Sequence, residues 1–122
     1  MCVKFLRSLL VATLMAFPAL AQDPPSFVSV INDLPLMEQL AEIGDGVQFS
    51  TSQGRIAEAT AQGTVSKNDV LAFYDDTLPQ LGWTKVGVGH FAREGETLEL
   101  VFERLNGVLS VRFALAPAPQ QK

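Results

Sequence analysis

Apolar and polar residues alternate most clearly in the last third of the chain. Residues 97–104 and 109–116 each place every second side chain in an apolar set, which is typical of a strand with one buried face. Asn106-Gly107 lies between the two runs and is a strong signal for a tight hairpin turn. We expect the hairpin to give the core two rows of side chains: Leu98, Leu100 and Phe102 from the first strand, and Leu109, Val111, Phe113 and Leu115 from the second.

Shorter strands are predicted before this hairpin. Each is an apolar or β-branched run bounded by glycine or polar turn residues. The longest places Ala57, Ala59 and Ala61 on one face, where small side chains would let a helix approach the sheet closely. The predicted strands span residues 47–50, 55–64, 83–88 and 90–93.

One helix is predicted between these strands. Ser66 is a suitable N-cap, and Asp69 three residues later completes a capping-box pattern. Pro79 should kink or loosen the last turn, and Gly82 is placed to end the helix in a left-handed conformation, with Trp83 folding back onto the apolar face. The helix carries an apolar stripe at helical spacing, made of Val70, Leu71, Phe73, Tyr74, Leu78 and Leu81.

Together these elements predict an α+β domain over residues 47–116. One main helix would pack on an antiparallel sheet, in the order ββαβββ. Residues 22–46 are expected to form an N-terminal arm or linker, with one or two helical turns over residues 36–43 and apolar residues that dock against the domain. The tail, residues 117–122, is expected to be disordered or extended.

The N-terminal residues have the order of a cleaved signal peptide. Lys4 and Arg7 form a positive region, an apolar run over residues 9–17 follows, and Ala19 and Ala21 supply the small residues of a cleavage site after Ala21. The alternative is an uncleaved membrane anchor, but a spanning helix needs about 20 apolar residues and this run is roughly half that length. We therefore expect a domain exported to the periplasm, or secreted, without a stable membrane anchor.

Charge restricts the partners of the exported domain. Without Lys4 and Arg7 the chain keeps seven of its nine basic residues against 13 acidic ones, a net charge of −6 with histidine neutral. A negative domain is a poor candidate for binding nucleic acid or anionic lipid, since both repel it. Electrostatic steering would favour a cationic partner.

Few residues are suited to catalysis or metal binding. Cys2 is the only cysteine and lies in the segment expected to be removed, and His90 is the only histidine, so it has no second histidine or cysteine beside which to bind a metal. Gly87-Val88-Gly89 lacks the third glycine of a nucleotide-binding motif. We expect no metal, no cofactor and no enzymatic activity.

A recurring theme covers residues 47–116. It consists of the helix with Phe73-Tyr74, the sequence Leu78-Pro79-Gln80-Leu81-Gly82-Trp83, and the following Phe91-Ala92-Arg93-Glu94-Gly95 and Leu98-Glu99-Leu100. It resembles small exported bacterial proteins of unknown function in which a helix ends in L-G-W and leads into a β-meander. The resemblance implies a fold and a place in the envelope, and it implies no substrate and no functional residue.

The sequence favours a non-catalytic periplasmic domain that binds a protein or an envelope component, of which an inhibitor of an exported hydrolase is a special case. The N-terminal arm, with Phe27, Val28 and Ile31, is a second expected contact surface. The alternative is a small enzyme or ligand carrier that uses the carboxylates between Glu94 and Glu103 with His90 or Arg93. The expected partner surface is the outer sheet face with Glu58, Thr60, Gln62, Glu99, Val101 and Glu103.

Overall fold

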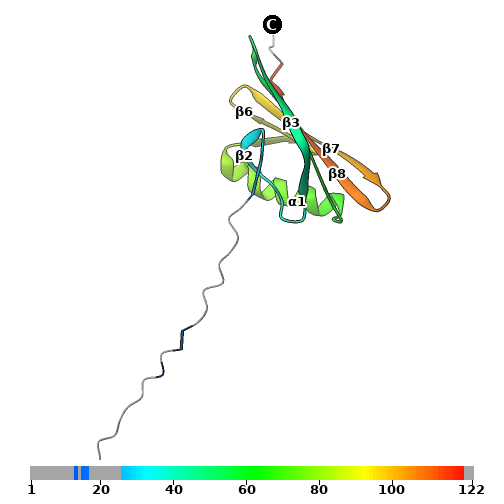
Figure 1. Ribbon diagram of the computed structural model, residues 1–122. Coiled ribbons are helices and arrows are strands. Elements are labelled where there is room, and N and C mark those ends of the chain that lie inside the picture. Colours follow the sequence, from blue (N-terminus) through cyan, green and yellow to red (C-terminus); the bar gives the residue numbers. More distant parts are fainter. Residues whose placement is uncertain (1–12, 14, 17–25, 120–122) are drawn as a thin grey trace, which may run out of the picture.

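The computed structural model describes residues 13, 15–16 and 26–119 (Figure 1). The predicted cleavage site after Ala21 lies outside the described residues. No helix of the described part is long and apolar enough to span a membrane. The elements, in chain order, are β1 (Phe27–Val28), β2 (Ile31–Pro35), β3 (Ala41–Thr51), β4 (Gly54–Gly63), α1 (Lys67–Thr77), the 3-10 turn Leu78–Leu81, β5 (Thr84–Gly87), β6 (His90–Arg93), β7 (Glu96–Leu105) and β8 (Val108–Pro117).

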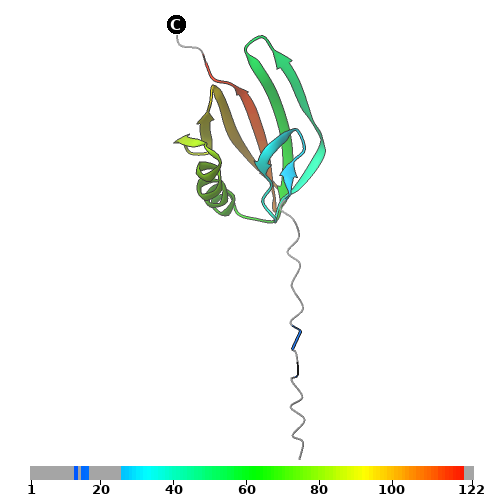
Figure 2. The same ribbon diagram turned by 90° about the vertical axis from the view of Figure 1, so that its left-hand side faces the viewer.

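Six of the strands form one antiparallel sheet in the order β3-β4-β8-β7-β6-β5. The hairpin β7–β8 is in register over its whole length, from Glu96 opposite Pro117 to Leu105 opposite Val108. Asn106 and Gly107 both have positive φ, 52° and 78°, as a type I′ turn requires. β1 and β2 form a separate hairpin, which lies with α1 on the same face of the sheet (Figure 2).

The prediction of an α+β fold with one helix packed on a sheet is wrong. Strands hold 58% of the described residues and helical turns 15%, and there are two sheets, so the fold is largely β. The difference arises mainly before residue 47, where a linker with helical turns was expected. There the chain forms β1, β2 and the first half of β3. The ββαβββ order therefore lacks the first two strands, and it has three strands after the helix where the structure has four.

The N-terminal segment is part of the core rather than an arm that docks on its surface. Five of its apolar side chains are almost fully buried, and no α-helical turn forms over residues 36–43. The segment runs so close to β4 that a Cβ added to Gly63 would stand 2.1 Å from the carbonyl oxygen of Gln39. Its buried side chains are Val28, Ile31, Leu34, Met37 and Leu40.

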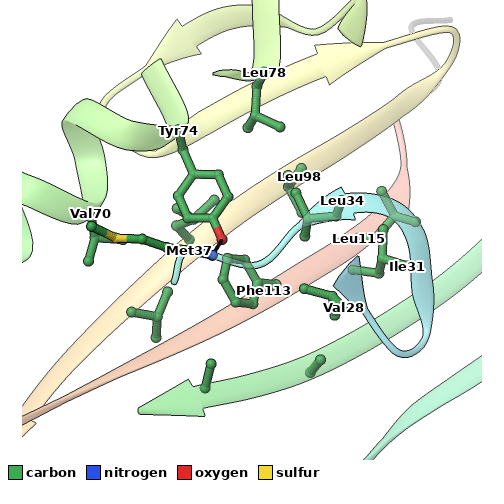
Figure 3. Close-up of a cluster of buried hydrophobic side chains, with 14 of the residues drawn as sticks. Val28, Ile31, Leu34, Met37, Val70, Tyr74, Leu78, Leu98, Phe113 and Leu115 are labelled. Atoms are coloured by element: carbon green, nitrogen blue, oxygen red, sulfur yellow. Dashed lines mark hydrogen bonds between the residues drawn. The ribbon is translucent and has the colours of Figure 1, made fainter. Parts of the chain in front are cut away.

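Tyr74 of α1 holds this segment in place (Figure 3). Its hydroxyl donates a hydrogen bond to the carbonyl oxygen of Pro35 at 2.8 Å and accepts one from the backbone N–H of Met37 at 3.3 Å. The ring meets Phe113 of β8 edge-on, with centroids 5.4 Å apart. A single side chain therefore connects the helix, the sheet and the link between β2 and β3.

The predicted N-cap and left-handed glycine both form, but α1 ends at Thr77 and Gly82 ends the 3-10 turn that follows it. The Ser66 hydroxyl accepts a hydrogen bond from the N–H of Asp69 at 3.0 Å. Gly82 adopts the left-handed conformation with φ 92°, and the N–H of Trp83 bonds the carbonyl of Leu78 at 3.1 Å. These two caps are confirmed, and the second directs Trp83 into the core, where it is 3% exposed.

The predicted inner faces of β4, β7 and β8 are also confirmed. Each of the three alanines of β4 and each of the four apolar residues predicted to face inward on β8 is buried, as are Leu98 and Leu100 of β7. Phe102 is only half-buried, near the end of β7. Alternate residues of the same strands therefore form the opposite face of the sheet, which α1 and the β1–β2 hairpin do not cover (Figure 2).

Candidate functional site

The six residues expected to form a partner surface share the uncovered face of the sheet. β8 pairs with β4 on one side and with β7 on the other, so the six lie in three rows that cross these strands. The middle row joins Thr60 to Arg112 and Arg112 to Val101. The other rows run from Glu58 through Ala114 to Glu99, and from Gln62 through Ser110 to Glu103.

We call these nine residues the outer block. Its charges are mainly negative. Arg112 is its one cation and lies 3.3 Å from the carboxylate of Glu58. Glu99 has His90 of β6 at 3.7 Å, an ion pair only when the imidazole is protonated, and Glu103 forms no ion pair within the part of the chain that the structure describes. Two glutamates on β7 therefore remain available to a cation approaching this face.

An exposed apolar row at the edge of the same face was missed by the sequence analysis. Ile43, Val47 and Phe49 of β3 are 43%, 57% and 51% exposed. They pair with Thr60, Glu58 and Ile56 of β4, and so lie on the outer side. The spacing of Val47 and Phe49 already indicates one strand face, but sequence alone does not place β3 at an edge.

The N-terminal arm is not available as the sequence analysis expected. Val28 and Ile31 are 1% and 0% exposed, because they fill the core beneath the β1–β2 hairpin. Phe27 alone of the three is exposed, at 49%. A partner that contacts this hairpin would therefore contact Phe27 and the polar residues on the exposed side of its two strands.

A network of charged side chains joins the hairpin to the sheet. Arg93 of β6 pairs with Asp33 of β2, and Arg55 of β4 lies 3.9 Å from Asp33 and 2.9 Å from Glu96 of β7. The Arg93 guanidinium also donates to the carbonyl of Leu81 at 3.0 Å. The hydrogen bond to Glu96 is the main reason that the pKa of Arg55 is raised. We call Asp33, Arg55, Arg93 and Glu96 the charged clasp.

We expect the clasp to make the stability of the domain sensitive to acid. Burial raises the pKa of Asp33, but the hydrogen bond and charge of Arg93, with the charge of Arg55, outweigh it and hold the pKa below its ordinary value. A carboxyl with a lowered folded pKa stabilises the fold above its unfolded pKa of about 3.9. That contribution is lost as the pH falls through the lower, folded value.

We therefore expect the Asp33→Asn variant to depend less on pH than the wild type. Between about pH 5 and about pH 2 the free energy of unfolding of the wild type should fall further, because only the wild type loses this carboxylate. Urea titrations across that range measure the difference. Asp76→Asn, at an exposed carboxylate of α1, is the control, and equal slopes for wild type and Asp33→Asn would contradict the role given to Asp33.

The carboxylates of the alternative enzyme or carrier hypothesis do not converge. Glu99 faces His90 on the outer side, and Glu103 lies one row beyond Val101, toward the β7–β8 turn. Glu94 and Glu96 instead border a pocket of about 480 Å³ at the β6–β7 turn. The pocket wall also includes Leu81, Val86, Ala92 and Arg93, and its Glu96 is already bonded to Arg55.

In the described residues, histidine, cysteine, aspartate and glutamate nowhere form a group of three placed to hold a metal ion. Asp75 and Asp76, adjacent on α1, point in different directions, and Asp75 instead accepts from Lys85 at 3.0 Å. The outer block with its apolar edge thus combines two carboxylates of β7 with three exposed apolar side chains of β3 on one face of the sheet. In comparisons with known proteins, no family model, no curated protein and no solved structure matches this chain.

Proposed function

We propose that this chain is an exported, non-catalytic domain that binds a cationic protein or envelope component through the outer face of its sheet. The observation that carries the proposal is the one-sided covering of the sheet. α1 and the β1–β2 hairpin bury one face, and the other presents the outer block (Figure 2). Export rests on the order of residues in the expected signal peptide, in keeping with the resemblance to small exported bacterial proteins.

A sheet face is a suitable platform for binding because its side chains are held in fixed rows. The register of β4, β8 and β7 sets the spacing of Glu58, Glu99 and Glu103 independently of any loop. A partner that presents basic side chains at matching positions would need little rearrangement of this domain on binding, which lowers the entropic cost. The net charge of the exported domain would steer such a partner toward it.

The proposal predicts that a partner is captured from the outer block and not from the helix side. The whole chain, expressed with its own N-terminal segment, would carry a photoreactive residue at Gln62 or Val101, or at Asn68 on the exposed side of α1. Illumination of cells followed by mass spectrometry of periplasmic adducts should give one dominant product from the first two positions. The Asn68 variant should not give that product.

Charge reversal makes the test specific. Glu99→Lys with Glu103→Lys should reduce the yield of the adduct at least about tenfold, since opposed like charges at an interface cost several kcal/mol. Glu94→Lys, at an exposed turn away from the outer block, should leave the yield unchanged. Equal capture at Asn68 and Val101, or an adduct that survives the double reversal, would overturn the proposed surface.

A further inference from the structure

The two halves of β3 differ in their surroundings. The first half lies beside the β1–β2 hairpin: Ser29 donates from its hydroxyl and its backbone N–H to the Glu42 carboxylate, and a Cβ on Gly46 would meet Val30 at 3.0 Å. The register with β4 shifts between Ile43 and Val47, so a bulge separates the halves. Beyond it, residues 47–51 pair with β4 alone.

This second half, which we call the free segment, is an open strand edge. β3 is the first strand of the sheet, so among the described residues one side of its backbone has no neighbouring strand. Antiparallel pairing leaves every second residue with its N–H and C=O directed to that side. All five residues are exposed, and Val47 and Phe49 are apolar: the free segment is Val47, Gln48, Phe49, Ser50 and Thr51.

We propose that the free segment pairs with the free segment of a second copy of this chain, in an antiparallel arrangement centred on Phe49. The two sheets then become one sheet of twelve strands about a two-fold axis. In this register Phe49 of each copy lies beside Phe49 of the other, and Val47 beside Thr51. Each Phe49 stays opposite Ile56 of its own β4. The edge strand β3 of each copy then becomes an internal strand of the joined sheet.

The distribution of charged residues along β3 favours a second copy of this chain as the partner of the free segment. The free segment contains no charged residue, while Glu42 and Asp45 lie in the other half of β3. An antiparallel pair therefore sends the acidic halves of the two copies in opposite directions, away from each other. A basic extended peptide would find no carboxylate within the free segment. The segment also lacks the lysine and proline that often prevent pairing between strand edges.

The expected dimer is weak. Stable interfaces bury about 1,200–2,000 Å² in total, and the pairing of one short strand from each copy lies at the lower end of that scale or below it. Dimers should therefore form at high protein concentration and dissociate on dilution. The inference does not rest on the proposed function, because the outer block lies on β4, β8 and β7, whereas the pairing uses the edge of β3.

Sedimentation velocity over a concentration series tests the association. The wild type should shift from monomer to dimer, and Phe49→Lys should remain monomeric with an unchanged melting temperature, because Phe49 is exposed and fills no core position. Val86→Lys, a matched change at a 63% exposed residue of β5 on the opposite edge of the sheet, should still dimerise. A wild type that stays monomeric at every concentration, or equal loss with both lysines, overturns the proposal.

A thiol at the centre tests the register. In a chain with Cys2→Ser, Phe49→Cys should form a disulfide dimer under mild oxidation, because directly opposite Cβ atoms in such a pair are about 4.5–5.5 Å apart. Ser52→Cys should not, since three residues from the axis on each strand separate the thiols by about 20 Å. Cross-linking of Ser52→Cys as readily as Phe49→Cys would overturn the pairing centred on Phe49.

Discussion

Replacing Tyr74 by alanine should lower the free energy of unfolding by about 3–5 kcal/mol, the range for truncating a buried aromatic residue. Tyr74 is 0% exposed and meets Phe73 and Phe113 edge-on, with centroids 4.9 and 5.4 Å away. Its hydroxyl also holds Pro35 and Met37. A typical domain has only about 5–15 kcal/mol in total, so the variant should be close to unfolding at 37 °C.

The Tyr74→Phe variant separates the hydroxyl from the ring. It keeps the aromatic contacts but leaves the Met37 N–H and the Pro35 carbonyl without this partner, at a cost of about 1–3 kcal/mol. Urea denaturation of the two variants gives both values. If Tyr74→Phe matched the wild type, the hydroxyl would not anchor the N-terminal segment, and the loss in Tyr74→Ala would be packing alone.

The same hydroxyl adds a dependence on alkaline pH. Burial raises the pKa of Tyr74, so the folded protein holds the phenolic proton more tightly than the unfolded chain does. The contribution of the protonated phenol is complete below the unfolded pKa of about 10 and is lost as the pH rises above it. Tyr74→Phe lacks this group, so its stability should fall less above about pH 10 than that of the wild type.

Elements defined by neighbouring residues could be predicted from the sequence. The Asn106-Gly107 turn, the Ser66 cap and the left-handed Gly82 depend on interactions within a few positions of the chain. The alternating strands around the turn also fix their own inner faces, since a shift of one residue would reverse them. Local rules of this kind were enough to predict the strands of the sheet that follow the helix.

The N-terminal segment did not follow from such rules. Residues 27–40 are short apolar pieces between polar residues and prolines, and their strand conformation depends on partners far along the chain. Tyr74 lies 37 residues from Met37, and Arg93 lies 60 residues from Asp33. Only the folded sheet brings these groups together, so a local reading assigns the segment to a linker and the fold to the wrong class.

The candidate site divides in the same way. The parity of residues along β4 and β7 places Glu58, Thr60, Glu99 and Val101 on outer faces from the sequence alone. That the two strands flank β8, and that β3 is an edge, follows from long-range pairing. The exposed apolar row of the candidate site therefore depends on the position of β3 in the sheet, and the sequence pattern does not reveal that position.

Trp83→Ala should also cost about 3–5 kcal/mol, for a different structural reason. Trp83 is 3% exposed, and the guanidinium of Arg93 lies 4.3 Å from the centre of its ring. Arg93 connects this ring to Asp33 and so to the β1–β2 hairpin. Removing the indole leaves a cavity and also removes the aromatic ring against which the Arg93 guanidinium of the charged clasp packs.

Trp83→Phe is the informative partner of that variant. The indole N–H has no hydrogen-bond partner among the described residues, so phenylalanine loses no hydrogen bond and still offers Arg93 an aromatic face. Its melting temperature should lie much closer to the wild type than that of Trp83→Ala. If Trp83→Phe were as unstable as Trp83→Ala, an aromatic face for Arg93 would not be what Trp83 contributes to stability. An unchanged melting temperature in Trp83→Ala would instead show that the Trp83 ring contributes nothing to the stability of the core.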